Sequence, residues 1–369
     1  MLTRIHVTSF RWIDLLTLTL WQHTYIQWAN GSGKTHVLDA IHLLSGSRPL
    51  YGNSSLSVGT LFEGFFEHDW LERSYRLYHD DKREFFSLQG TKTTRPKYMT
   101  ALPWRTVYIS PFDMNLLYFA PLMRRDTMDL TLARTYEQFA RVKKDYELVM
   151  RERNALLKKI REWEASRDML DFWDKKFSEL AETYLLYRTK YISYIEVSLS
   201  EHPAFFSKYP IIFSYTSSVD AYRIESGLVG DSDSVVILSY LRERRERDIL
   251  SGHTHIGPHR DDWGFSILQY QDTQNSTPES SIPAETYLSR WEMKMLLLGY
   301  KMIEASFIEK ILDIPVILLI DDIFAELDER NSEVFLNSLR THQIILTSQK
   351  PLPNHEKHHD FICINLEDS

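Results

Sequence analysis

Cysteine, long apolar runs and glycine are all scarce in this chain. Cys363 is the only cysteine among the 369 residues, so no disulfide can form within one chain, and a reducing cytoplasm is the expected location. No run of about 18 apolar residues occurs, so no segment is expected to span a membrane. Residues 1–7 read as a strand and lack the layout of a secretory signal peptide. These absences predict a protein of the cell interior.

The chain also lacks an excess of basic residues. Its net charge is −8 and its pI is near 6.0, so the bulk composition gives no nucleic-acid signal. A local basic surface is still compatible with these values, because acidic residues elsewhere offset it. The content of 43% hydrophobic and 25% charged residues is that of an ordinary soluble globular protein. Partners therefore have to be inferred from individual motifs.

Most of a phosphate-binding loop is present near the N-terminus, in the sequence Asn30-Gly31-Ser32-Gly33-Lys34-Thr35. The backbone N–H groups of such a loop surround phosphate oxygens at the positive end of the helix that follows. Lys34 is expected to reach the β- and γ-phosphates, and the Thr35 hydroxyl to coordinate Mg²⁺. The pattern G-x-x-x-x-G-K-[ST] has a glycine at position 28, where this chain has Trp28.

An acidic pair follows the apolar run at residues 314–320, which is typical of a strand buried on both faces. Paired acids after a strand are common, but together with Lys34 and Thr35 they predict a phosphoryl-transfer site. Asp321 is expected to hold Mg²⁺, and Asp322 to orient or deprotonate the attacking water. These side chains supply the positioning and the charge neutralisation that this chemistry needs.

The distribution of apolar runs, turn residues, Gly and Pro along the sequence predicts a mixed α/β fold in three parts. Residues 1–121 and 246–369 alternate short apolar runs with turns and are expected to form two halves of a sheet-containing head. Residues 122–245 are expected to form an inserted helical arm, because residues 134–194 contain neither Gly nor Pro. Apolar residues of this arm recur at helical spacing, at Leu148, Leu156, Leu157 and Ile160.

Residues 288–294 read as the start of an amphipathic helix with Ser289 as its N-cap. By its own residues the segment indicates no more than that. In ATPases built from two facing heads, a Leu-Ser-x-Gly-Gln segment at this place contacts the γ-phosphate held by the other subunit. Here Trp291 stands at the glycine position and Glu292 at the glutamine position.

With these motifs the chain resembles the RecF family, bacterial recombination-repair ATPases related to SMC and Rad50 heads. Two further motifs separate this family from other ABC-type ATPases. They run from Pro111 through Arg124-Arg125 to Asp129, and over Gly257-Pro258-His259-Arg260-Asp261-Asp262. Matching segments also occur after the acidic strand and in the arm, at Ala325-Glu326-Leu327-Asp328-Glu329-Arg330 and Arg153-Asn154-Ala155-Leu156-Leu157-Lys158. The resemblance covers nearly the whole chain.

The resemblance implies an ATP-dependent DNA-binding clamp of recombinational gap repair. Such proteins dimerise on binding ATP, bind DNA at gaps or at junctions between single and double strands, and hydrolyse ATP slowly. They work with RecR and RecO to help load RecA, in DNA replication, repair and the SOS response. The implied fold is an ABC/SMC-type P-loop ATPase head with an inserted helical arm, and the implied cofactors are ATP and Mg²⁺.

The same resemblance implies roles for individual residues. It implies that Lys34, Asp322 and Ser289 are catalytic, with Ser289 acting on nucleotide bound by a second copy of the chain. Mg²⁺ ligation falls to Thr35 and Asp321. Nucleotide binding falls to Asn30, Gly31, Ser32, Gly33, Lys34 and Thr35.

The basic residues of the two family motifs can be interpreted as having either of two functions. In one, Arg124, Arg125, His259 and Arg260 serve DNA or the ATP-bound interface. In the other, the arginines pair with acidic residues to hold the heads together, the candidates being Asp126, Asp129, Asp261 and Asp262. His259 has no metal-ligand spacing with other histidines.

Three positions depart from the family pattern, with Trp28, Trp291 and Phe119 at places where glycine is usual. Glycine permits unusual backbone angles and close approach to phosphate, which indole does not. Glycine makes up only 13 of the 369 residues, whereas tryptophan makes up 9. We hypothesise that Trp28 and Trp291 are glycines in the organism's own protein, encoded by UGA and translated here with the wrong table. UGG at both codons would contradict this hypothesis, which does not cover Phe119.

Two alternatives to an active RecF-type ATPase follow. The first is a degenerate scaffold that binds DNA or a partner without hydrolysing ATP. The second is another SMC/Rad50-like head. Against the second stand the inserted segment, which is too short for a long coiled coil, and the motif at residues 257–262.

Overall fold

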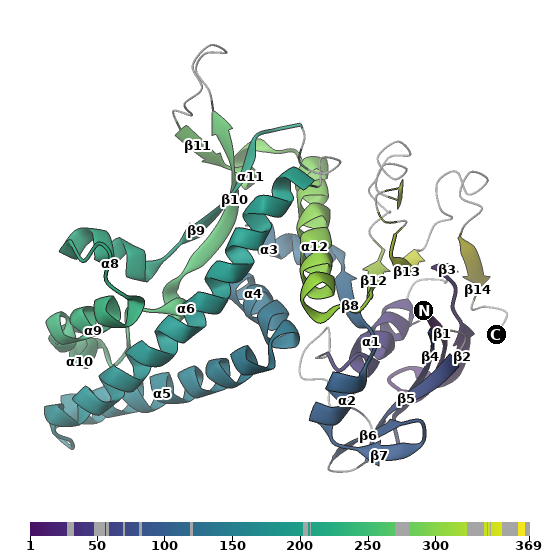
Figure 1. Cartoon of the computed structure of the whole chain (residues 1–369), viewed down its shortest axis with the longest axis horizontal. Coiled ribbons are helices and arrows are strands. Elements are labelled where there is room, and N and C mark those ends of the chain that lie inside the picture. Colours follow the sequence, from purple (N-terminus) through teal and green to yellow (C-terminus); the bar gives the residue numbers. More distant parts are fainter. Residues whose placement is uncertain are drawn as a thin grey trace. The chain divides into compact units, whose positions relative to one another are not determined.

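The computed structural model describes most of the chain. The described residues are 1–27, 33–47, 56, 59–68, 71–80, 83–118, 121–201, 206, 208–269, 280–322, 336–337, 339, 341–348 and 361–365. They form two compact units (Figure 1). The first unit consists of Met1–Met114 with Leu298–Ser369, and the second of Asn115–Leu297.

A five-stranded parallel sheet lies in the first unit, in the order β14-β3-β13-β12-β8. Its strands are β3 (His23–Gln27), β8 (Arg105–Ile109), β12 (Val316–Asp321), β13 (Gln343–Ser348) and β14 (Ile362–Asn365). Every residue of β8, β12 and β13 is buried, which explains the apolar run of β12. Parallel strands end at the same edge of a sheet, so the end of β12 lies beside the ends of β8 and β13. The predicted buried strand before the acidic pair is confirmed as β12.

A second sheet of the first unit is antiparallel, with the order β2-β1-β4-β5-β6-β7. Its strands are β1 (Leu2–Phe10), β2 (Ile13–Thr19), β4 (Leu61–His68), β5 (Leu71–His79), β6 (Glu84–Leu88) and β7 (Thr91–Thr93). Helix α1 (Lys34–Leu44) shares one hydrophobic core with both sheets, in which Val7 of β1, Ile41 of α1 and Ile317 of β12 are buried. The short helix α2 (Arg95–Ala101) and the 3-10 turn η1 (Pro111–Met114) complete this part of the chain. Burial of its apolar face packs α1 against both sheets, and Thr35 in its first turn reaches the end of β12.

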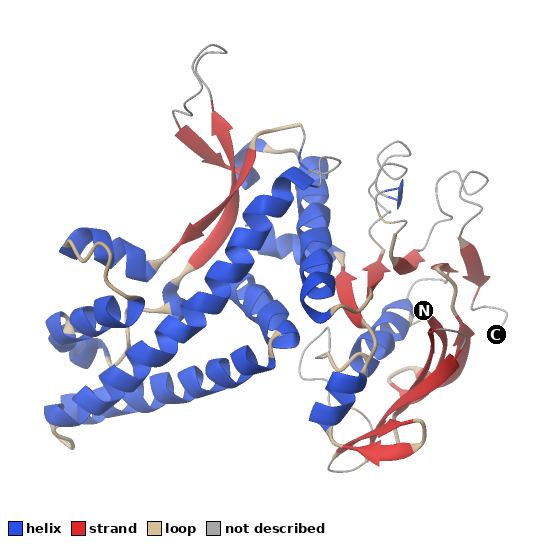
Figure 2. Ribbon diagram, in the orientation of Figure 1, coloured by secondary structure: helices blue, strands red, loops and turns tan. Residues whose placement is uncertain are grey.

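The second unit is built around two long helices that pack against each other, α5 (Glu137–Arg161) and α6 (Leu170–Glu201) (Figure 2). The turn η2 (Arg167–Met169) precedes α6. Aromatic rings fill the space between the two helices, where Tyr146 of α5 lies 5.1 Å from both Phe177 and Tyr184 of α6, measured between ring centroids. The absence of Gly and Pro correctly predicted long helices over residues 134–194.

Shorter elements complete the second unit. Its other helices are α3 (Asn115–Tyr118), α4 (Pro121–Thr135), α8 (Ser218–Ser226), α9 (Asp233–Glu243), α10 (Arg245–Ser251) and α11 (Ala284–Tyr287), with the turn η3 (Pro258–Arg260). A three-stranded antiparallel sheet has the order β11-β10-β9, with β9 (Ile211–Thr216), β10 (Asp262–Gln269) and β11 (Ser280–Pro283). Helix α12 (Arg290–Leu312) contains the division between the units. The expected three-part division, with an arm over residues 122–245, stays a prediction.

Of the helices that the structure describes, none has the length and apolarity to cross a membrane.

Candidate nucleotide site

Asp321, the last residue of β12, gathers three hydroxyl groups around its carboxylate. Thr35 of α1 and Tyr108 of β8 each donate to Oδ2 at 2.8 Å, and Thr347 of β13 donates to Oδ1 at 2.6 Å. The carboxylate is nearly buried, and these donors replace the water it would otherwise bind. The structure thus brings together Thr35 and Asp321, the two predicted Mg²⁺ ligands.

Asp322 and Lys34 lie at the same edge of the sheet. Asp322 has a φ of 44°, in the left-handed region that non-glycine residues rarely adopt, and its N–H donates to the carbonyl of Thr347 at 3.0 Å. Burial lowers the pKa of Lys34 from its ordinary value, and the carboxylates of Asp322 and Asp321 raise it in part. One cation and two acids therefore lie within electrostatic reach of one another.

Gly33 begins helix α1 with a φ of 99°, in the region that favours glycine. Its carbonyl accepts the N–H groups of His36 and Val37, which closes the first turn of the helix. Residues 28–32 lie outside the described residues, so the predictions for Trp28, Asn30, Gly31 and Ser32 stay predictions. The same holds for Phe119 and for the segment at residues 325–330.

The donor set at this edge fits a magnesium nucleotide. Mg²⁺ prefers oxygen ligands and is usually held by one or two protein groups together with phosphates and water, which Thr35 and Asp321 match. In the described part of the chain, no group of three or more His, Cys, Asp or Glu side chains forms a metal site without such help. A helix N-terminus opened by a left-handed glycine is suited to phosphate oxygens.

Tyr108 and Thr347 are site residues that the sequence did not reveal. Each lies near the end of a strand adjacent to β12, at positions where a parallel sheet gathers side chains. Aligning the ends of those strands with Asp321 would have pointed to both hydroxyl groups.

Ser289, the predicted catalytic residue of the second unit, lies at the start of α12. Its Oγ and its backbone N–H donate to Oε2 of Glu292 at 2.7 and 2.9 Å, and the N–H of Glu292 lies 3.4 Å from Oγ. This reciprocal arrangement is a capping box, which agrees with the prediction of Ser289 as N-cap. Trp291 lies in the first turn of α12 and is not one of the described residues with a positive φ. The backbone conformation at this position therefore accepts a side chain.

The other oxygen of Glu292 is held by a separate segment. Oε1 accepts hydrogen bonds from the Lys208 ammonium and, at 2.9 Å, from the Tyr209 hydroxyl. Burial raises the pKa of Glu292, but the hydrogen bonds from Lys208, Ser289 and Tyr209 outweigh it and lower the pKa to about 2. Glu292 is therefore ionised at neutral pH.

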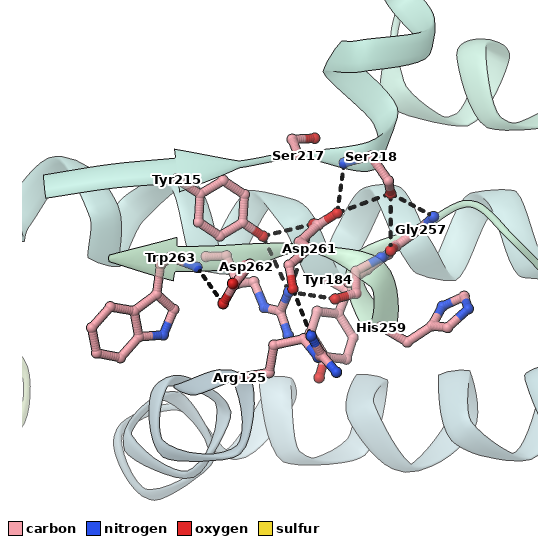
Figure 3. A network of polar contacts seen from close by, with 12 residues as sticks. Arg125, Tyr184, Tyr215, Ser217, Ser218, Gly257, His259, Asp261, Asp262 and Trp263 are labelled. Carbon is pink, nitrogen blue, oxygen red and sulfur yellow. Dashed lines mark hydrogen bonds and ion pairs between the residues drawn. The ribbon is translucent and has the colours of Figure 1, made fainter. Parts of the chain in front are cut away.

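The motif at residues 257–262 anchors a buried polar network of the second unit (Figure 3). Asp261 is fully buried and accepts the Tyr215 hydroxyl at 2.7 Å and both the N–H and the hydroxyl of Ser218, at 2.8 and 2.9 Å. Arg188 of α6 donates to both oxygens of Asp129 at 2.9 Å. The Arg188–Asp129 pair joins α6 to α4, and hydrogen bonds from Arg188 to the Pro258 carbonyl and from Tyr215 to Asp261 join α6 and β9 to the motif.

The basic residues of the family motifs contact the second unit itself. Arg124 donates to the two oxygens of Asp262 at 2.8 and 2.7 Å, and Arg125 donates to the carbonyl of Asp261 at 2.8 Å. Arg260 donates instead to the carbonyl of Thr254. Arg124 thus pairs with Asp262, one of the acids expected as a partner, whereas the contacts found for Arg260 go to a backbone carbonyl; that such pairs hold the heads together stays a prediction. These contacts stabilise the unit from within.

His259 is fixed by two partners. Nδ1 lies 2.6 Å from the Tyr146 hydroxyl, and Nε2 lies 3.1 Å from the Thr254 carbonyl. A carbonyl can only accept, so Nε2 carries the proton and Nδ1 accepts from Tyr146. Burial lowers the pKa of His259 to about 4, with smaller contributions from nearby arginines. His259 is a neutral structural residue at pH 7.

Comparison with known proteins points to one family. No family model matches the chain. A protein of Synechocystis sp. named DNA replication and repair protein RecF is 27% identical over 349 residues, covering 89% of this chain and 85% of that protein. The protein of that name from Shewanella loihica is 26% identical over 363 residues, covering 95% and 92%.

A solved structure has the same fold. It is described as the recombination mediator protein RecF-ATPrS in the RecFOR pathway and superposes with a TM-score of 0.81, at 21% identity, over 99% of this chain and 96% of that chain. The prediction of a mixed α/β ATPase-head fold is confirmed by this likeness.

Proposed function

We propose that this chain, which belongs to the RecF family, is an ATP-binding protein of DNA repair that acts on DNA. One observation carries the proposal: Thr35 and Asp321 meet at the carboxyl edge of a parallel sheet, with Lys34 and Asp322 beside them. The names of its relatives support the role in DNA replication and repair, and the similar structure was solved with a nucleotide.

In this proposal each residue of the edge has one role. Lys34 binds the β- and γ-phosphates, and Asp322 orients or deprotonates the attacking water. Thr35 and Asp321 hold Mg²⁺, which neutralises phosphate charge when bound. The hydroxyl groups of Tyr108 and Thr347 donate to Oδ2 and Oδ1 of Asp321, so that the orientation of its carboxylate is set before nucleotide arrives.

The finer parts of the proposal concern assembly. Two copies of the chain dimerise on ATP, with Ser289 of one copy acting on the nucleotide of the other, and ATP is hydrolysed slowly. The protein binds DNA gaps or junctions and assists RecA loading with RecR and RecO in the cytoplasm. Membership of the family supports these steps, as does the RecFOR pathway with which the similar structure is associated.

A second candidate function is a scaffold that binds DNA or a partner without hydrolysis. It is favoured by the hydrogen bond from the Ser289 hydroxyl to Glu292, which occupies the group expected to act in catalysis. Failure of nucleotide binding would favour this candidate.

Binding of ATP by the full chain tests the proposal. Lys34→Ala removes the cation that faces the phosphates, and we expect it to weaken ATP binding at least about tenfold, since one hydrogen bond to a charged group contributes roughly 1.5–3 kcal/mol. Lys97→Ala is the matched control, because Lys97 is an exposed lysine of α2 in the same unit. Equal affinities in titration calorimetry with ATP and Mg²⁺ for these two variants would contradict the assignment.

A further inference from the structure

The Glu292 carboxylate is surrounded by donors from two segments distant in sequence. Ser289 contributes its N–H and its hydroxyl to Oε2, whereas Lys208 and Tyr209 contribute an ammonium and a hydroxyl to Oε1. Only 15% of the Glu292 side chain is exposed. All of these contacts lie inside the second unit.

The donors around Glu292 are those that a phosphate group would take. Phosphate oxygens accept N–H groups at a helix N-terminus, hydroxyl groups and lysine ammonium groups, as a carboxylate does. Donors already engaged by an internal anion cannot serve an external one at the same time. A carboxylate here also repels a polyphosphate, since like charges in a partly buried place interact strongly.

We propose that Glu292 inhibits dimerisation on ATP. Its carboxylate occupies the Ser289 donors that would otherwise face a phosphate of nucleotide bound by a second copy of this chain. This inference rests on the proposed function, because it concerns the same Ser289 contact. Engagement of the second copy requires the Glu292 side chain to leave Ser289. Lys208 and Tyr209 determine how firmly it is held.

The two anchors differ in rigidity. The Tyr209 ring packs edge-on against Tyr287, with centroids 5.6 Å apart, which fixes its hydroxyl. The Lys208 side chain is 70% exposed, so water and salt compete with its ion pair. Loss of the Lys208 contact therefore leaves Oε1 of Glu292 with the Tyr209 hydroxyl alone, while Oε2 stays on Ser289.

Dimerisation of the full chain tests whether Glu292 blocks the Ser289 donors. Glu292→Gln keeps the shape of the side chain and removes its charge, and we expect it to tighten the dimer formed with ATP and Mg²⁺ at least about tenfold by sedimentation, with unchanged ATP affinity of the monomer. Lys208→Met is expected to shift the equilibrium in the same direction by less. Glu285→Gln, a charge removal at an exposed position of α11, is the control and should have no effect.

A second measurement needs neither ATP nor a dimer. Glu292→Ala leaves the donors without their internal acceptor, so inorganic phosphate should raise its Tm more than sodium chloride of equal ionic strength does. The double variant Ser289→Ala/Glu292→Ala should lose most of this rise. Equal rises in both variants would overturn the proposal, as would a Glu292→Gln protein that binds ATP but dimerises no better than the parent. Absence of ATP binding in the parent, with the phosphate effect intact, would contradict the proposed function alone.

Discussion

His259 shows at the scale of one residue how burial converts a titratable group into a structural one. Its two ring nitrogens are satisfied by Tyr146 and Thr254, and its pKa is lowered to about 4. In the unfolded chain a histidine has a pKa near 6.5. The unfolded state therefore binds more protons between these values, and the stability contributed by neutral His259 is present above about pH 6.5 and lost as pH falls through 4.

The change in unfolding free energy with pH tests this. Replacing His259 by Gln removes the titration, so the variant should lose roughly 3 kcal/mol less between pH 7 and pH 4 than the parent does. Urea denaturation at several pH values measures the difference. His253→Gln, at an exposed position, should keep the full pH dependence of the parent. A His259→Gln protein with an unaltered pH profile would show that the imidazole does not titrate as described.

Helix α6 shows at the scale of elements how one buried charge joins several parts of the second unit. Arg188 donates to both oxygens of Asp129 on α4, to the carbonyl of Pro258 at 2.7 Å and to the Tyr215 hydroxyl of β9 at 3.1 Å. Both charged side chains are nearly inaccessible to water. A buried pair of this kind is strongly destabilising when one partner is lost, because the other charge remains buried alone.

Substitution of Arg188 by Met is expected to lower the free energy of unfolding by about 3–5 kcal/mol, since it removes the two hydrogen bonds of the guanidinium and leaves the buried Asp129 carboxylate with the Tyr184 hydroxyl and a lysine ammonium, that of Lys143, 3.9 Å away. Lys175→Met, at an exposed position of the same helix, should change it by less than about 0.5 kcal/mol. Urea denaturation at neutral pH compares the two variants. A loss in Arg188→Met no larger than that of Lys175→Met would mean that the network contributes little to stability.

The sequence was most informative where local pattern decides the element. An unbroken apolar run identified β12, and the absence of Gly and Pro identified α5 and α6, because burial and helix propensity act over consecutive residues. Ser289 as an N-cap followed from the same kind of pattern. Contacts between distant segments could not be predicted from local sequence patterns. No such pattern distinguishes Asp129 from Asp126 as the partner of Arg188, and none indicates that Lys208 contacts Glu292.

For the whole molecule, the site at the end of β12 is one part of the proposed function and Ser289 is the other. The first unit contains Lys34, Thr35, Asp321 and Asp322, whereas Ser289 belongs to the second. If Ser289 acts on nucleotide held by another copy, ATP binding and dimerisation separate cleanly by mutation. Ser289→Arg should then bind ATP as a monomer, whereas Lys34→Ala should be weakened both in ATP binding and in dimerisation.

Light scattering of the full chain with and without ATP and Mg²⁺ tests the central claim most directly. The account predicts that ATP raises the mass from the 43.7 kDa of one chain toward that of two, more completely for Glu292→Gln, while Ser289→Arg stays at the mass of one chain although it binds ATP. The mass of the variant Trp28→Gly/Trp291→Gly with ATP, compared with that of the parent, shows whether the two tryptophans affect dimerisation. A mass that remains that of one chain in the parent, in Glu292→Gln and in the glycine variant, with ATP bound, would contradict the account.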